Sequence, residues 1–100
     1  MTIIYVSNKK IKVYGHSGYA EIGKDIVCAA ISTLTESTYR YLKVTKNNVE
    51  SIEEDGLFEI ILNGINDSGR EIIKEFVNIV KEIEEQYPLY IRSDFNEEIG

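Results

Sequence analysis

The hydrophobic and polar positions of the first fifteen residues indicate two β-strands. Residues 2–6 are rich in β-branched and aromatic side chains, and residues 11–14 alternate so that Ile11 and Val13 share one face. The polar residues 7–10 that separate these segments are typical of a turn. The pattern predicts that the chain opens with a β-hairpin.

From Asp25 onward the hydrophobic period changes to the three or four residues of an amphipathic helix. The positions that form one apolar stripe are Val27, Ile31, Leu34, Thr38 and Tyr41. Asp25 is a candidate N-cap, because its carboxylate can accept hydrogen bonds from the free N–H groups of the first turn. We therefore expect a helix over residues 25–42, preceded by a loop over residues 17–23.

The second half of the chain repeats the order of two strands and a helix. Residues 49–53 and 57–62 predict two strands, joined by a tight turn at Asp55 and Gly56. The helix that follows has a long apolar stripe, which consists of Ile72, Ile73, Phe76, Val77, Val80, Ile83 and Tyr87.

Both ends of this second helix have recognisable signals. Ser68 and Glu71 have the spacing of a capping box, in which the two side chains satisfy backbone donors reciprocally. Pro88 stops the helix, because proline lacks the N–H that a helix needs. Residues 89–92 then predict a last short strand, and the acidic residues after them are expected to fray.

The predicted element order is therefore β-β-α-β-β-α-β. Two hairpins and two amphipathic helices favour an α+β fold, with a mainly antiparallel sheet and both helices packed on one face. The 100 residues, of 11.4 kDa, are expected to form one domain, residues 1–100.

Charge and composition exclude several classes of function. The net charge of −6 disfavours nucleic acid, whose phosphates are bound mainly by basic patches. A single Cys and a single His leave no intrachain disulfide and no Cys/His zinc site, so we expect neither metal nor cofactor. No apolar run approaches the roughly 18 residues of a membrane span. These features predict a cytoplasmic protein.

The candidate chemistry rests on His16 and Cys28, which are twelve residues apart. If Asp25 caps the helix, Cys28 lies in the first turn, where the helix dipole stabilises a thiolate and free amides can donate to an oxyanion. A strand that leads through a loop into a helix on the same sheet can bring Cys28 back toward His16. The alternative is equally simple: a small buried cysteine and an incidental histidine.

The segment around these residues resembles the signature of the bacterial ribosomal-processing cysteine protease family, Prp. Residues 15–20 read G-H-S-G-Y-A, and residues 23–32 read G-K-D-I-V-C-A-A-I-S. The family pattern is roughly G-H-[AS]-G-Y-A-x-x-G-x-D-I-V-C-A-A-[VI]-S, and every fixed position is filled here. The resemblance is specific over residues 15–34, and the rest of the chain is compatible with it.

The resemblance implies a thiol protease that takes part in ribosome biogenesis by removing a short N-terminal extension from a large-subunit ribosomal protein. Cys28 would be the nucleophile, and His16 the general base and acid, with a thioester intermediate. Asp25 would cap the helix or orient neighbouring groups. A homodimer and an apolar substrate groove are also expected from the family.

The resemblance further implies a flap over the substrate. Its candidate residues are Gly15, Ser17, Gly18, Tyr19 and Gly23, and Ser32 would border the cleft one turn after Cys28. Each of these residues is also ordinary in a loop or at a helix contact. The alternative function is a non-catalytic ribosome-associated or protein-interaction module with the same fold.

Overall fold

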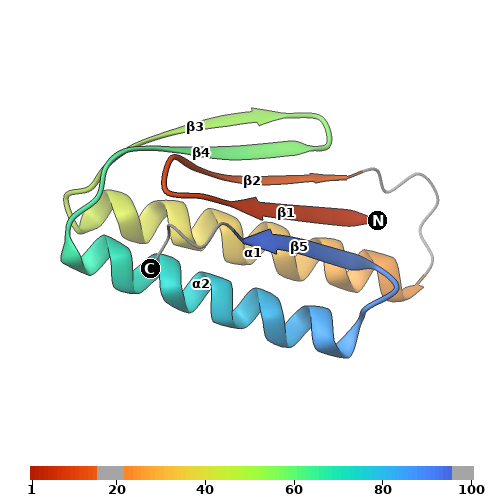
Figure 1. Ribbon diagram of the computed structural model, residues 1–100. Coiled ribbons are helices and arrows are strands. Elements are labelled where there is room, and N and C mark those ends of the chain that lie inside the picture. The colour runs from red at the N-terminus through yellow and green to blue at the C-terminus, as the bar shows by residue number, and fades with distance from the viewer. Residues whose placement is uncertain (16–21, 96–100) are drawn as a thin grey trace.

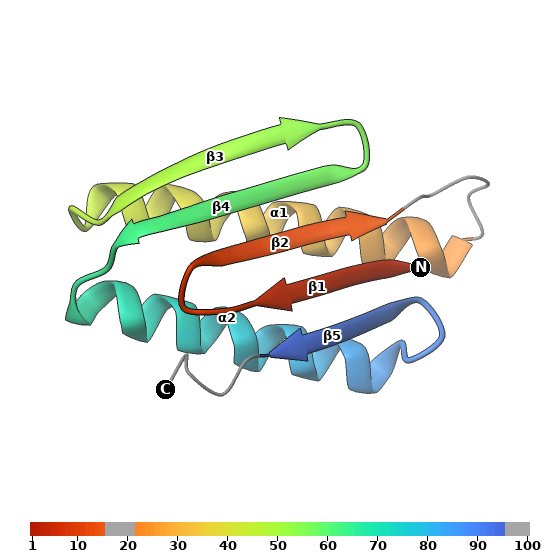
Figure 2. The ribbon, with the colours of Figure 1, turned by 45° about the horizontal axis from the view of Figure 1, so that its top comes forward.

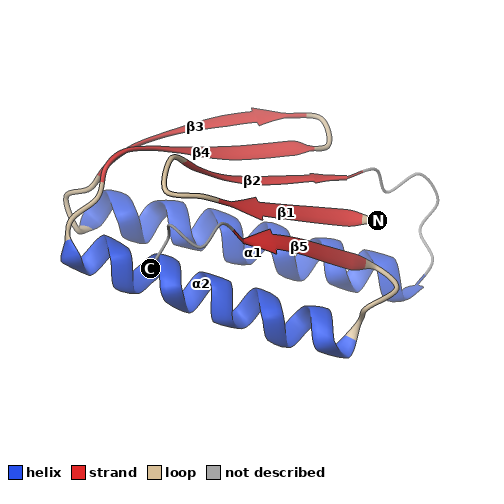
Figure 3. Cartoon of the chain, in the orientation of Figure 1, coloured by secondary structure: helices blue, strands red, loops and turns tan. Residues whose placement is uncertain are grey.

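The computed structural model describes residues 1–15 and 22–95 (Figure 1), and the side chains of the first helix from residue 26 onward. The elements occur in the predicted order (Figure 3). They are β1 (Thr2–Val6), β2 (Lys10–Gly15), α1 (Ile22–Val44), β3 (Asn48–Glu54), β4 (Leu57–Gly64), α2 (Asp67–Gln86) and β5 (Ile91–Phe95).

The five strands form one sheet in the order β3-β4-β2-β1-β5. Neighbouring strands are antiparallel, except that β1 and β5 run parallel. Both helices cover the same face of this sheet (Figures 1 and 2). The structure therefore confirms the predicted α+β fold, with a mainly antiparallel sheet and helices on one side. Within the described residues, neither helix is long and apolar enough to cross a membrane.

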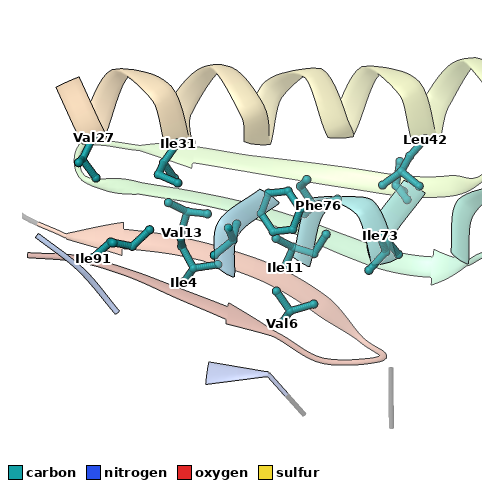
Figure 4. Packing of buried hydrophobic residues seen from close by; sticks show 13 residues of the cluster. Ile4, Val6, Ile11, Val13, Val27, Ile31, Leu42, Ile73, Phe76 and Ile91 are labelled. Carbon is teal, nitrogen blue, oxygen red and sulfur yellow. The ribbon is translucent and has the colours of Figure 1, made fainter. Parts of the chain in front are cut away.

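The hydrophobic core lies between the sheet and the two helices (Figure 4). Because successive strand residues point to opposite faces, alternate positions of β1 and β2 enter this core. The buried residues are Ile4, Val6, Ile11, Val13, Val27, Ile31, Leu42, Val49, Ile60, Ile73, Phe76, Val80 and Ile91.

The strands lie where the sequence predicts them, with one exception. β1 has the predicted bounds, and β2, β3 and β4 contain the predicted strands and extend them by one or two residues. The last strand begins at Ile91 rather than at the predicted residue 89. Leu89 is 79% exposed, and the N–H of Tyr90 donates to the carbonyl of Tyr87 at 3.0 Å. A turn therefore occupies the residues after Pro88.

The first helix differs from its prediction at the start and in one stripe position. Four predicted positions are buried or half-buried, namely Val27, Ile31, Leu34 and Thr38. Tyr41, however, is 62% exposed, and Leu42 is buried in its place. Residues four apart lie on the same side of a helix, so Leu42 lies on the core side with Thr38. The helix starts at Ile22, so Asp25 is its fourth residue and not its N-cap.

The second helix is capped two residues earlier than the sequence predicts. Its N-cap is Asn66, whose Oδ1 accepts a hydrogen bond from the N–H of Gly69 at 2.8 Å. Ser68 is therefore inside the helix, and the predicted capping box is wrong. The helix ends at Gln86, which confirms the stop signal of Pro88.

Asn47 links the end of α1 to the start of α2. Its side chain is 7% exposed and donates to the carbonyl of Leu42 at 3.1 Å, while its Oδ1 accepts from the N–H of Asn66 at 2.8 Å. Gly69 packs directly against it, because a Cβ at Gly69 would lie 2.7 Å from Asn47 Cγ. This polar link fixes Asn66 in the position from which it caps α2.

Candidate active site

Cys28 lies on the second turn of α1, at the boundary between the buried and the exposed sides of the helix. It is half-buried, and its neighbours on the core stripe, Val27 and Ile31, are both about 1% exposed. Its Sγ is 3.4 Å from Oγ1 of Thr2, at the start of β1. The thiol is thus held against the sheet and still borders open space.

The early start of α1 changes the expected surroundings of Cys28. Because the helix begins at Ile22, Cys28 is its seventh residue and not its third. Only the first four N–H groups of a helix lack a partner within the helix, and the dipole effect falls off within the first turn. The expectation that Cys28 lies in the first turn, where the helix dipole stabilises a thiolate and free amides donate to an oxyanion, is therefore wrong.

A cavity of about 240 Å³ lies beside Cys28, between α1 and the sheet ends. Its lining includes Gly15 and Ser32, so the structure brings three of the predicted site residues together. Apolar side chains also line it, namely Val13, Ile31, Leu57 and Phe58, and these can hold hydrophobic parts of a ligand. Glu53 and Glu54 at the end of β3 line it as well.

Gly15 allows the two strands of the opening hairpin to meet closely beside this cavity. It is the register partner of Thr2, and a Cβ at Gly15 would lie 2.9 Å from the Cα of Thr2. A larger residue would therefore push β1 away from β2. Glycine is needed here for close backbone approach, one residue before His16 in the sequence.

The remaining predicted residues are placed as follows. His16, Ser17, Gly18 and Tyr19 lie outside the described residues, whereas Gly23 belongs to the first turn of α1. The segment described, residues 1–15 and 22–95, contains no group of three or more His, Cys, Asp or Glu side chains suited to a metal ion.

Sequence reasoning missed Thr2 and the end of the β3–β4 hairpin, which both line the cavity. One signal for Thr2 was present. Among the inward-facing positions of β1, Thr2 is polar, whereas Ile4 and Val6 belong to the core. The hairpin residues carry no comparable signal, because their approach to α1 depends on the order of strands in the sheet.

Comparison with known proteins identifies the family to which this site belongs. The family described as "Cysteine protease Prp" matches residues 2–92 of the chain. The chain belongs to this family. It is therefore a cysteine protease, as the resemblance over residues 15–34 implies, and not the alternative of a non-catalytic module. No curated protein matches the chain.

Solved structures share the Prp fold over nearly the whole chain. The ribosomal processing protease Prp from S. aureus, in complex with a substrate peptide, has a TM-score of 0.79 and 24% identity, covering 95% of this chain and 97% of its own. The same S. aureus protease with a covalently linked product peptide has a TM-score of 0.76 and 25% identity, over the same shares. SMU.848 from Streptococcus mutans has a TM-score of 0.74 and 24% identity, covering 94% of this chain and 90% of its own.

Proposed function

We propose that this Prp family member is a cytoplasmic endopeptidase that removes a short N-terminal extension from a large-subunit ribosomal protein. The observation that carries the proposal is the family match over residues 2–92, which includes the complete signature around His16 and Cys28. The related S. aureus protease is a ribosomal processing enzyme that binds a substrate peptide and a covalently linked product peptide. A peptide is therefore the substrate expected at the cavity beside Cys28.

Cys28 is the proposed nucleophile. Its thiolate attacks the scissile carbonyl carbon, and His16, which has accepted the thiol proton, returns a proton to the departing amine. The peptide C–N bond breaks, and the N-terminal part of the substrate stays on Cys28 as a thioester. His16 then takes a proton from water as the water oxygen adds to the thioester carbonyl. The C–S bond breaks, the N-terminal fragment leaves with a free carboxyl group, and His16 returns its proton to the sulfur of Cys28.

The lining of the cavity fits the proposed substrate class. The apolar side chains of Val13, Leu57 and Phe58 provide a surface for hydrophobic residues of the extension. Glu53 and Glu54 add negative charge beside it, and the chain as a whole carries −6, which attracts a basic ribosomal protein.

The supporting residues have narrower proposed roles. Ser32 borders the cleft, and Asp25, inside the first helical turn, orients neighbouring groups rather than caps the helix. Ser17, Gly18 and Tyr19 are proposed to form a flap over the peptide, flanked by Gly15 at the end of β2 and Gly23 in α1. The active protein is proposed to be a homodimer. Size-exclusion chromatography with light scattering tests this by measuring the molar mass in solution.

Mass spectrometry of a cleavage reaction tests the function. The substrate is the ribosomal protein of the same organism with its N-terminal extension, and Cys28→Ala and His16→Ala are compared with the wild type. We expect one defined cut by the wild type and none by Cys28→Ala. Cleavage by a folded Cys28→Ala variant would contradict the assignment of the nucleophile. Absence of cleavage by the folded wild type would contradict the assignment of the substrate.

A further inference from the structure

We propose that Thr2 is a positioning residue for Cys28, and that its hydroxyl holds the sulfur in the orientation from which it attacks. The inference rests on the proposed role of Cys28 as the nucleophile. Oγ1 of Thr2 lies 3.4 Å from Sγ of Cys28, within hydrogen-bond distance for sulfur, although 26 residues separate the two in sequence. Thr2 is 7% exposed, so most of its surface is shielded from water.

The backbone of Thr2 is fixed by strands on both sides. Its N–H donates to the carbonyl of Tyr90 at 2.9 Å, and it is the register partner of Gly15 in β2 and of Ile91 in β5. Its side chain is β-branched, which restricts rotation about χ1. The hydroxyl is therefore carried by the first residue of an interior strand, which positions a group more accurately than a loop does.

The direction of the hydrogen bond depends on the state of the sulfur. In the neutral thiol, either the hydroxyl or the S–H can donate. A thiolate has no proton, so in the attacking state the Thr2 hydroxyl must donate to Sγ. Hydrogen bonds to an ionised acceptor are stronger than those between neutral groups. The contact therefore holds the sulfur in a fixed orientation in the form of Cys28 that reacts.

The pattern of β1 supports a specific role for the hydroxyl. The inward-facing positions of this strand are Thr2, Ile4 and Val6, and the latter two are fully buried and apolar. Valine has nearly the shape of threonine and would suit this strand position equally well. The polar side chain occurs at the inward position that meets the sulfur.

Thr2→Val and Thr2→Ser separate the hydroxyl from the packing of the side chain. The first readout is the alkylation rate of the folded protein by iodoacetamide near neutral pH, which reports Cys28 alone because the chain has one cysteine. The second is kcat and KM for cleavage of the extension-bearing ribosomal protein. The matched control is Thr38→Val, which removes a buried hydroxyl that donates to Leu34 O at 2.8 Å, on the same helix as Cys28.

We expect Thr2→Val to lower both the alkylation rate and kcat by about tenfold, with KM nearly unchanged, as for the loss of one hydrogen bond to a charged group. Thr2→Ser keeps the hydroxyl and should stay within about threefold of the wild type, as should Thr38→Val. Circular dichroism checks that each variant is folded. If Thr2→Val does not fold, the pair Thr2→Ser and Thr2→Ala gives the same comparison, and alanine should be about tenfold slower than serine.

Three results would overturn the proposal: Thr2→Val as fast as the wild type, Thr2→Ser as slow as Thr2→Val, or Thr38→Val equally slow. The two readouts also separate this inference from the proposed function. If the wild type does not cleave the ribosomal protein, the substrate assignment fails. The alkylation rates still decide whether Thr2 acts on the sulfur.

Discussion

Replacing Gly69 by alanine has two opposing effects on stability at the first turn of α2: higher helix propensity and tighter packing. Gly69 is buried there, and an added Cβ would lie 2.7 Å from both Asn47 Cγ and Ile65 Cγ2. Real Cβ atoms are essentially never found so close to other heavy atoms, so the neighbours must move. Asn47 can move only by weakening its hydrogen bonds to Leu42 and Asn66.

The magnitudes decide the direction of the effect. Alanine gains about 1 kcal/mol over glycine in a helix interior. Overpacking costs about 1–3 kcal/mol, and the loss of one of the Asn47 hydrogen bonds costs about 1 kcal/mol more. We therefore expect Gly69→Ala to lower the free energy of unfolding by about 1–3 kcal/mol, although propensity alone predicts an increase.

Urea unfolding followed by circular dichroism measures this change, as a lower midpoint with an unchanged slope. Gly64→Ala is the matched control, because its Cβ would lie 3.6 Å from the Cβ of Asn48, an ordinary contact, and should change stability by less than about 0.5 kcal/mol. Asn47→Ala should partly relieve the clash, so the double variant with Gly69→Ala should lose less than the sum of the two. A Gly69→Ala protein as stable as the wild type would refute the reasoning.

Two further pairs of variants test the helices by the same unfolding measurement. Asn66→Ala removes the N-cap of α2 and should lower the free energy of unfolding by about 1 kcal/mol. Ser68→Ala should change it by less than about 0.5 kcal/mol. A larger loss for Ser68→Ala than for Asn66→Ala would favour the capping box instead. Leu42→Ala should lower the free energy of unfolding by about 2–5 kcal/mol, because Leu42 is fully buried. Tyr41→Ala should have a small effect, because Tyr41 is 62% exposed. Equal losses for the two variants would contradict the observed orientation of the helix.

Local patterns were sufficient to predict the order of elements, but not every helix end. When one face of a strand or helix is buried, hydrophobic residues recur along the sequence with the period of that element. The type of each element can therefore be predicted from the sequence. The start of α1 was misplaced because glycine at position 23 is typical of a loop, yet the structure includes it in the helix. The N-cap of α2 was misplaced because Asn66 is held by Asn47, nineteen residues away.

The candidate site was only partly accessible from the sequence. The signature supplied His16 and Cys28, and the structure adds the cavity that joins Cys28 with Gly15 and Ser32. Thr2 could not be recognised as a neighbour of Cys28, because that contact requires β1 to lie beneath the second turn of α1. Tertiary contacts of this kind depend on strand order, which the local pattern of residues does not encode.

The parallel pairing of β1 with β5 has a consequence for the newly made chain. Synthesis proceeds from the N-terminus, so β1 leaves the ribosome early, whereas its partner on one side is residues 91–95. Until those residues emerge, β1 is an edge strand, and the N–H of Thr2 lacks the carbonyl of Tyr90. The support beneath Cys28 is therefore completed only after β5 has been made.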